Sequence, residues 1–290
     1  MLGGAAHIHP HIYNEGMSRR LRIDSVSNDR IKALVRLRKR RERQRTGRFL
    51  IEGGREMTRA YQAKVRLEQL FLAPALLPPG SARLISALED DPGVQVFEVS
   101  SNAFRKASFR EHPDGLLAVA RSWKTSLDEL TFRGIPLLLV IAGLEKPGNV
   151  GALLRTADAA GIDAVFITDN GTDPFNPKVI RASMGSVFNR PVLPVTAAEF
   201  IPWVRALGIR LVATAPEAPL SYWDTSLTEA TAVILGNEHQ GLAANWFEEA
   251  AVTVNIPVTG AADSLNVATA GALVVFEALR QRRCRGARDQ

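Results

Sequence analysis

Residues 136–169 read PLLLVIAGLEKPGNVGALLRTADAAGIDAVFITD, and the organisation of the C-terminal half can be built outward from them. The apolar run at 136–143 predicts a buried strand, and 163–169 predicts a second one. Between them, Val150, Leu153 and Ala157 recur at helical spacing, and Gly161 is typical of a residue that ends a helix. Two strands joined by a helix in this order predict a parallel pair.

The same pattern continues toward the C-terminus. Further apolar runs lie at 190–195, 209–215, 232–237 and 252–257, and helical patterns separate most of them. A last helix is expected from Ser264 to about Arg283. Apolar strands that alternate with helices predict an α/β fold, in which a mostly parallel sheet over 136–290 is covered on both faces.

The N-terminal third alternates shorter strands and helices, which predicts a smaller α/β/α domain over 23–121. A basic helix is expected at 28–45 and further helices at 56–63 and 83–88, with strands at 48–53, 67–73, 94–100 and 115–120. Residues 122–135 are polar and are expected to be a linker. Residues 1–22 are expected to be a flexible leader, and the alternating His7, His9 and His11 in it have no nearby Cys or acidic partner for a metal.

Positive charge is concentrated in one segment of the chain. The net charge is +6, but residues 19–48 alone hold 13 Lys or Arg and 3 Asp or Glu, a net of +10. Such a segment indicates a polyanion partner, because neutralised phosphates release counterions. The alternative is a solvated helix face, and thirty residues at this charge favour nucleic acid.

Several classes of protein are disfavoured by what the sequence lacks. It has one cysteine, Cys284, no run of eighteen apolar residues and no signal-peptide pattern, so a cytoplasmic protein is expected. No phosphate loop of the GxxxxGK[ST] type and no GxGxxG follows a strand, and no GxSxG is present. No Cys/His constellation indicates a metal.

Three segments that follow strands are candidates for chemistry, because ligands bind at the carboxyl ends of strands in open α/β sheets. The first is GLEKPGNVGALLRTADAAGID (143–163), in which Arg155 lies opposite the buried stripe, beside the bare backbone of Gly151. The alternative for Arg155 is a surface ion pair with Asp158.

The second segment is AVILGNEHQGL (232–242), in which Gly236 allows close backbone approach and Glu238 places a carboxylate at a strand end. The alternative is an acid at a helix N-terminus. The third is IPVTGAADSLNVATAGALVVFEA (256–278), in which small residues permit close helix packing. Here the alternative is an N-cap formed by Ser264.

Together and in this order, the three segments resemble the motifs of the SpoU (TrmH-type) family of RNA ribose 2′-O-methyltransferases. The resemblance covers about 136–283 and includes RASMGSVFNRPV (181–192), which is similar to the family's Arg-x-Ser-x-Gly segment. The first domain, with IKALVRLRKRRERQRTGRFLIEGGREM (31–57), resembles the L30e-like RNA-binding domain of many members. The matching motif residues are Asn149, Gly151, Arg155, Gly161, Gly236, Asn237, Glu238, Gly241, Leu242, Ile256, Pro257, Gly260, Ser264, Leu265 and Asn266.

The resemblance implies a deep trefoil knot in the C-terminal sheet, S-adenosylmethionine as the cofactor, and a homodimer with residues of both subunits near each site; no metal is expected, since the Cys/His pattern for one is missing. It implies that Arg155 activates the ribose 2′-hydroxyl and that Asn149, Glu238, Ser264 and Asn266 orient Arg155 and the ribose. An Arg side chain stays protonated, so stabilising a developing alkoxide is an easier role for it than acting as a base. The implied cofactor-binding residues are Thr214, Ala215, Gly236, Asn237, Ile256, Val258, Ser264, Leu265 and Asn266.

The L30e-like domain favours ribosomal RNA as the substrate, most simply 23S rRNA. The candidate RNA-binding residues are Asn28, Lys32, Arg36, Arg38, Arg43, Arg48 and Arg55. Two alternatives are a tRNA methyltransferase and an RNA-binding protein without turnover. The Ala- and Arg-rich composition suits an actinobacterial source, where some relatives confer antibiotic resistance of the avilamycin or thiostrepton type.

Overall fold

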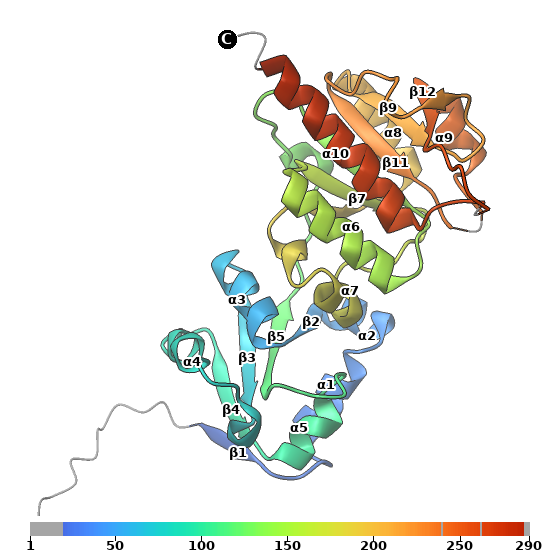
Figure 1. Ribbon diagram of the computed structural model, residues 1–290. Coiled ribbons are helices and arrows are strands. Elements are labelled where there is room, and N and C mark those ends of the chain that lie inside the picture. The colour runs from blue at the N-terminus through green and yellow to red at the C-terminus, as the bar shows by residue number, and fades with distance from the viewer. Residues whose placement is uncertain (1–19, 239, 262, 287–290) are drawn as a thin grey trace, which may run out of the picture.

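The structure is a computed structural model, and it describes residues 20–238, 240–261 and 263–286. It consists of two α/β parts that follow one another along the chain (Figure 1). The expected leader lies outside the described residues, except for its last three positions. Of these, Leu21 and Arg22 belong to a strand, because β1 (Leu21–Ile23) pairs in parallel with a later strand.

The N-terminal part is a five-stranded mixed sheet in the order β1-β4-β3-β5-β2. After β1, its strands are β2 (Arg48–Glu52), β3 (Leu67–Leu72), β4 (Gln95–Val99) and β5 (Leu116–Arg121). β1, β4 and β3 are parallel, whereas β5 runs antiparallel to β3 and β2. The helices are α1 (Asp29–Arg36), α2 (Arg40–Thr46), α3 (Gly54–Gln62), α4 (Ala82–Glu89) and α5 (Ser101–Ala107), with a 3₁₀ turn η1 (Pro74–Leu76).

The single basic helix predicted at 28–45 is wrong, because the chain breaks it into α1 and α2. Leu37, at the break, turns into the core and is 5% exposed. The guanidinium of Arg43 donates to the carbonyl oxygens of Leu37 and Arg38, which the end of α1 leaves without helical partners. Arg38 in turn donates to the last carbonyls of α5. Tertiary contacts therefore outweigh the helical propensity of this segment.

The C-terminal part is a seven-stranded, wholly parallel sheet in the order β10-β12-β9-β11-β6-β7-β8. The strands are β6 (Leu137–Ala142), β7 (Ala164–Thr168), β8 (Val192–Pro194), β9 (Arg210–Thr214), β10 (Leu220–Ser221), β11 (Thr231–Leu235) and β12 (Val252–Asn255). The predicted α/β class and the mostly parallel sheet are confirmed. All carboxyl ends of these strands therefore meet at one edge of the sheet.

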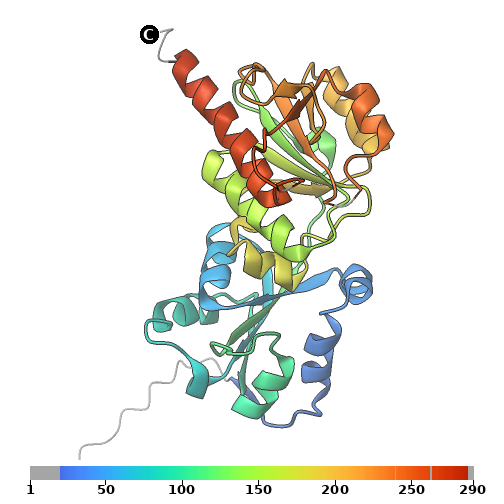
Figure 2. The same cartoon turned by 45° about the vertical axis from the view of Figure 1, so that its right-hand side comes forward.

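Helices cover both faces of this sheet (Figure 2). One face packs on α6 (Pro147–Ala160) and α10 (Val267–Gly286), and the other on α8 (Ala197–Ala206) and α9 (Ala244–Glu249). Alternate residues of β6 point to opposite cores: Leu139 packs toward the first pair of helices and Val140 toward the second. A short helix α7 (Pro177–Ala182) and a 3₁₀ turn η3 (Ser186–Phe188) lie between β7 and β8. None of the helices in the described residues is both long enough and apolar enough to span a membrane.

The two parts contact each other through a packed junction. The rings of Phe49 and Trp123 meet those of Phe175 and Phe188, with Trp123 edge-on to Phe175 at 4.8 Å between centroids. The predicted linker takes part through Trp123, and it includes a 3₁₀ turn η2 (Leu127–Glu129). The segment 181–192 also lies here, because Arg59 of α3 donates to the Met184 carbonyl and to Ser186 Oγ.

Candidate functional site

The second and third motif segments converge on one pocket at the carboxyl ends of β9, β11 and β12. We call it the motif pocket, and its volume is about 770 Å³. The strand end at Thr214 and Ala215 forms a further wall. Of the nine residues assigned to the cofactor, Asn266 does not line the pocket. The other eight do: Thr214, Ala215, Gly236, Asn237, Ile256, Val258, Ser264 and Leu265.

Asn237 and Gly241 close the loop that follows β11. Their backbone groups exchange two hydrogen bonds, each 2.9 Å long, and Gly241 has a φ of +67°. A Cβ on Gly236 would lie 2.6 Å from the carbonyl carbon of Gly241, so glycine is needed there by the chain's own turn. The Asn237 side chain donates to the Gly143 carbonyl at 2.8 Å, which ties this loop to the end of β6.

Glu238 has one paired and one free carboxylate oxygen. Its Oε2 accepts from Lys146 Nζ at 2.7 Å, and Lys146 stands at the N-terminus of α6 in the first motif segment. Its Oε1 is buried and has no hydrogen-bond partner within the part of the chain that the structure describes. An unpartnered buried carboxylate oxygen is costly, and at a pocket wall it is a ready acceptor for a ligand.

Asn266 joins the first and third segments. Its Nδ2 donates to Asn149 Oδ1 at 3.3 Å, and its Oδ1 accepts from Ala268 N at 2.9 Å. Asn266 therefore caps α10, a role that the sequence had left open for Ser264. Ser264 is exposed and lines the pocket instead. Small residues do allow close packing here, because a Cβ on Gly271 would lie 2.5 Å from Leu153 of α6.

Arg155 lies apart from the pocket that the other segments form. It is exposed on α6, does not line the motif pocket, and has no ion pair or hydrogen bond among the described residues. The alternative partner, Asp158, accepts from Asn189 Nδ2 at 2.9 Å instead. Gly151 is not open backbone, because a Cβ there would lie 2.4 Å from Ala182 of α7. The structure thus leaves the Arg155 guanidinium free for a partner outside this chain's described residues.

Other polar side chains of the pocket were missed from the sequence. Glu217, Gln240 and Asp263 line it, and Asn255 contributes a buried Oδ1 that has no partner in the described ranges. Asp263 stands next to Ser264 in the third segment, so its position was the one available signal. Glu217 lies in the loop after β9, and the sequence of that loop carries no motif.

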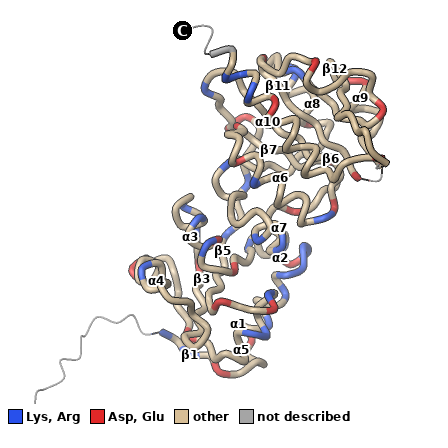
Figure 3. Tube along the Cα trace, in the orientation of Figure 1, with Lys and Arg blue, Asp and Glu red and all other residues tan. Residues whose placement is uncertain are grey.

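The proposed RNA-binding residues have different surroundings. Arg43 is buried, 4% exposed, and pairs with Asp173 at 2.8 Å across the junction, so it is not available on the surface. Asn28 caps α1, Arg38 caps α5, and Lys32 pairs with Asp29. Arg36 and Arg55 are exposed and lie 3.9 and 4.0 Å from a glutamate, whereas Arg48 donates to Glu68 at 2.5 Å. Figure 3 shows Lys and Arg gathered along α1 and α2.

No group of His, Cys, Asp and Glu that could hold a metal occurs among residues 20–238, 240–261 and 263–286.

Comparison with known proteins relates both parts of the chain to RNA modification. Residues 136–276 match the SpoU rRNA Methylase family, and residues 28–118 match the MRM3-like substrate binding domain. A relative from Bacillus subtilis, 23S rRNA (guanosine(2553)-2′-O)-methyltransferase RlmP, is 33% identical over 254 residues, which is 88% of this chain and 97% of that protein.

Two solved structures match over nearly the whole chain. One, described as an RNA 2′-O ribose methyltransferase, is 44% identical with a TM-score of 0.80, covering 91% of this chain and 100% of that one. The other is AviRb from Streptomyces viridochromogenes in complex with the cofactor AdoMet (S-adenosylmethionine). It is 28% identical with a TM-score of 0.80, covering 89% of this chain and 100% of that one.

Proposed function

The chain belongs to the SpoU rRNA methylase family, and on that premise we propose that it methylates a ribose 2′-hydroxyl of 23S ribosomal RNA. Membership makes it a methyltransferase that uses S-adenosylmethionine. The observation that carries the proposal is the motif pocket, to which strand ends far apart in sequence each contribute polar side chains. Because the substrate is ribosomal, the proposed activity belongs in the cytoplasm.

The motif pocket fits S-adenosylmethionine in size and chemistry. Its volume of about 770 Å³ falls in the range of small-molecule sites. Ile256 and Leu265 offer apolar surface, while the free oxygens of Glu238 and Asn255 can accept hydrogen bonds from an ammonium or a hydroxyl. When bound, the cofactor supplies an electrophilic methyl group on a sulfonium. We assign its binding to Thr214, Ala215, Gly236, Asn237, Ile256, Val258, Ser264, Leu265 and Asn266.

The remaining residues would align and activate the ribose. Displacement at a methyl group needs the attacking oxygen in line, so orientation contributes most to the rate. Glu238 and Ser264 line the pocket, and Asn266, which follows the lining residue Leu265, is linked to Asn149; together they offer acceptors and donors that can hold a ribose. Arg155 cannot serve as a base, since its guanidinium stays protonated, but it can stabilise the developing negative charge on the 2′-oxygen.

The position of Arg155 supports a homodimeric site. Leu273 and Phe276 on α10 are 39% and 47% exposed, and α10 packs beside α6, which carries Arg155. A second copy on this apolar face would bury both side chains and could bring its own Arg155 to the motif pocket. The trefoil knot is also part of the proposal, supported by family membership.

The N-terminal part would dock the RNA. Its match to a substrate binding domain and the exposed cations on α1 and α2 support this role. The exposed candidates are Lys32, Arg36, Arg38, Arg48 and Arg55, and of these Arg36 and Arg55 have no hydrogen-bonded partner within the described chain. Binding that depends on such cations should weaken steeply with added salt.

The proposal is tested by incubating the purified protein with S-adenosylmethionine and either protein-free ribosomal RNA or total tRNA, and then mapping 2′-O-methyl groups. We expect one methylated ribose in 23S rRNA and none in tRNA, with the Arg155→Ala variant inactive. Methylation of tRNA alone would favour the tRNA alternative. Binding of cofactor and RNA without any transfer would favour an RNA-binding protein without turnover.

Antibiotic resistance is a separable part of the proposal. The chain is similar both to a Bacillus relative and to a Streptomyces one, and their names do not distinguish maintenance of the ribosome from protection of it. The test is to express the chain or its Arg155→Ala variant in a sensitive host and to compare the inhibitory concentrations of the antibiotics. A rise in the inhibitory concentration of avilamycin or thiostrepton with the active chain alone supports resistance, and an unchanged value refutes it.

A further inference from the structure

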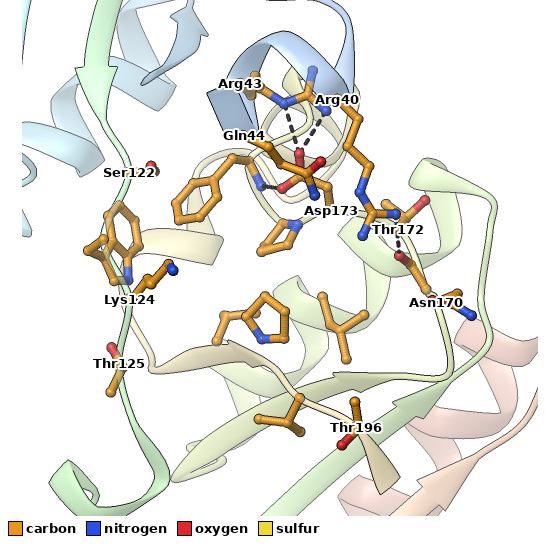
Figure 4. A pocket seen from close by; sticks show the side chains of 18 of the residues that line it. Arg40, Arg43, Gln44, Ser122, Lys124, Thr125, Asn170, Thr172, Asp173 and Thr196 are labelled. Carbon is orange, nitrogen blue, oxygen red and sulfur yellow. Dashed lines mark hydrogen bonds and ion pairs between the residues drawn. The ribbon is translucent and has the colours of Figure 1, made fainter. Parts of the chain in front are cut away.

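A second cavity lies at the junction of the two parts, outside the motif pocket. We call it the junction pocket, and its volume is about 810 Å³. Its walls come from α2, from residues 122–125 of the linker, and from the carboxyl ends of β7 and β8 (Figure 4). In that view Lys124 reaches in from the linker side, and Arg40 and Gln44 approach from α2.

The walls combine flat apolar rings with polar edges. Trp123, Phe175, Pro174 and Pro194 line the pocket with ring surfaces. Gln44 and Asn170 add amide groups that both donate and accept hydrogen bonds. Flat apolar faces with amide groups around them match a nucleobase, which stacks on its faces and hydrogen bonds through its edge.

The acids of the pocket all accept hydrogen bonds, whereas two of its three cations, Arg40 and Lys124, have donors without a partner among the described residues. Asp173 pairs with Arg43, Asp169 accepts from the Trp246 indole at 2.7 Å, and Glu199 accepts from both Thr196 N and Thr196 Oγ1. Lys124 is exposed and has no ion pair or hydrogen bond with any residue that the structure describes. Arg40 makes a single hydrogen bond of 3.3 Å to the Gly171 carbonyl. Asp169 and Glu199 keep their negative charge, so the lining as a whole is not positive, but the unused donors of Arg40 and Lys124 can bind a phosphate next to the base.

The junction pocket also lies between the basic helices and the motif pocket. Arg40 and Gln44 belong to α2, on the +10 segment. At the other end, β7 and β8 share their carboxyl edge with the strands of the motif pocket, and β6 stands between the two groups. Gly143, at the end of β6, accepts from the Asn237 side chain and donates to the Thr168 carbonyl, one residue before Asp169.

We propose that the junction pocket binds one unpaired nucleotide of the RNA substrate. The base would lie against Trp123 and the proline rings, and its phosphate would lie between Arg40 and Lys124. This inference rests on the proposed function, since it takes the substrate to be RNA. It adds a specific contact between the docking domain and the methyl-transfer site.

Occupancy is tested by ultraviolet cross-linking of the full chain to protein-free ribosomal RNA, with nuclease digestion and mass spectrometry of the adducts. We expect nucleotide adducts on peptides that contain residues 123–125 or 40–47, and we expect them to persist at saturating S-adenosylmethionine. A parallel arm replaces the RNA with free nucleoside monophosphates. Adducts from free nucleotides alone, or adducts that the cofactor displaces, would overturn the proposal.

A matched pair of charge reversals gives a second test by ribosomal RNA binding at fixed ionic strength. Arg40→Glu and Arg41→Glu change the net charge equally on neighbouring residues of α2, but only Arg40 lines the pocket. We expect Arg40→Glu to weaken binding about fivefold more than Arg41→Glu, because only Arg40 would contact the phosphate of the bound nucleotide. Equal losses would contradict a nucleotide in the pocket.

Lys124→Glu repeats the test without touching the bond to Gly171, in case Arg40→Glu disturbs the junction, and thermal melting checks that each variant is folded. We expect Lys124→Glu to weaken binding more than Arg41→Glu does. These measurements need no methyl transfer. An inactive enzyme that still forms the adducts would refute the proposed function alone, and an active one without them would refute only the junction pocket.

Discussion

The carboxylate of Glu238 illustrates how a weak contact can matter for rate. Lys146 holds one oxygen of Glu238 at 2.7 Å, but the Lys146 side chain is 62% exposed. An exposed pair of this kind contributes at most about 1 kcal/mol to the free energy of unfolding. Its effect on catalysis can be larger, because a small displacement of an orienting group costs much of the rate.

We therefore expect Lys146→Met to lower kcat for ribosomal RNA methylation about tenfold, with the melting temperature nearly unchanged. Lys146→Arg keeps a cation beside Glu238 and should retain most of the activity. Lys178→Met is the control, since Lys178 is an exposed lysine of α7 away from the motif pocket. If Lys146→Met behaves like Lys178→Met in steady-state kinetics, Lys146 does not position Glu238.

Glu52 is a buried acid that the proposed reaction does not use. It is 1% exposed, and burial raises its pKa above the ordinary 4.5 despite hydrogen bonds from Ser108 Oγ and Phe109 N. A raised native pKa means that the folded chain binds the proton more tightly than the unfolded chain does. The resulting stability is complete below the unfolded pKa and is lost as pH rises through the native pKa.

Glu52→Gln should remove this pH dependence, because an amide has no proton to lose. We expect the wild-type free energy of unfolding, from urea titrations, to fall relative to that of Glu52→Gln as pH is raised upward from 4.5. Parallel curves for the two proteins over this range would show that Glu52 titrates alike in the folded and unfolded chains.

At the scale of elements, the close packing of α6 on α7 depends on Gly151, for which the sequence predicted a different role. Gly151 was considered as open backbone beside Arg155, but it lies against α7. Gly148, one turn earlier, is open, because a Cβ added there would meet no heavy atom of another part of the described chain within 4 Å. A substitution at Gly151 therefore changes the packing of α6 on α7, whereas one at Gly148 changes only the helix propensity of α6.

We expect Gly151→Ala to destabilise the protein by about 1–3 kcal/mol, because its Cβ must displace Ala182 and the backbone of Ser183. Gly148→Ala should change stability by less than about 1 kcal/mol, as alanine favours helix and meets no obstacle. Urea unfolding of both variants tests the contrast. Similar values for the two would mean that α6 and α7 move apart easily.

The break between α1 and α2 depends on a residue far along the chain. Arg43 supports the break through two carbonyls and pairs with Asp173, which is 11% exposed. We expect Arg43→Ala to cost about 3 kcal/mol in unfolding free energy, because it leaves a buried carboxylate without its partner. Arg43→Ala combined with Asp173→Asn should recover part of that loss.

The same variants separate structure from RNA binding. Once folded, Arg43→Ala with Asp173→Asn should lose less affinity for ribosomal RNA than Arg36→Ala does, because the Arg43 donors are taken up by Asp173 and by the carbonyls of Leu37 and Arg38. A larger loss in the folded double variant than in Arg36→Ala would show that Arg43 or Asp173 contributes directly to RNA binding, since both line the junction pocket.

These elements also show which parts of the fold could be predicted from the sequence. Strands such as 163–169 were predictable because apolar runs in a parallel sheet are nearly continuous, and the observed β7 falls inside that range. The two-residue β10 carries no such signal. The break after α1 was hidden because Asp173, 130 residues on from Arg43, helps to decide it. Local pattern cannot report a contact that only the tertiary fold creates.

In the candidate site, too, local patterns were predictable and tertiary contacts were not. Eight of the nine residues that the motifs assigned to the cofactor line the motif pocket, since the carboxyl ends of parallel strands share an edge, and their roles stay a prediction. The pairing of Lys146 with Glu238 spans 92 positions and was not visible in either segment, although both segments had been singled out. The junction pocket combines α2, the linker and β7, so no single stretch of sequence could indicate it.

At the scale of the whole molecule, Arg155 does not reach the motif pocket of its own chain. Arg155 is exposed on α6, apart from the pocket that holds Glu238, which suits a site completed by a second subunit. In such a dimer, Arg155→Ala damages one half of each site and Glu238→Gln damages the other half. A mixed dimer of the two variants would contain one site with both residues intact.

We expect each variant alone to be inactive and their mixture, after unfolding and refolding together in equal amounts, to regain activity. Random pairing yields intact sites equal to about a quarter of those in the wild type, so about a quarter of the wild-type methylation rate should return. Refolding each variant alone provides the control. The result that contradicts this is a mixture that stays inactive while refolded wild type recovers its activity. Arg155 and Glu238 of one site would then come from the same subunit, and the site would not be shared between subunits.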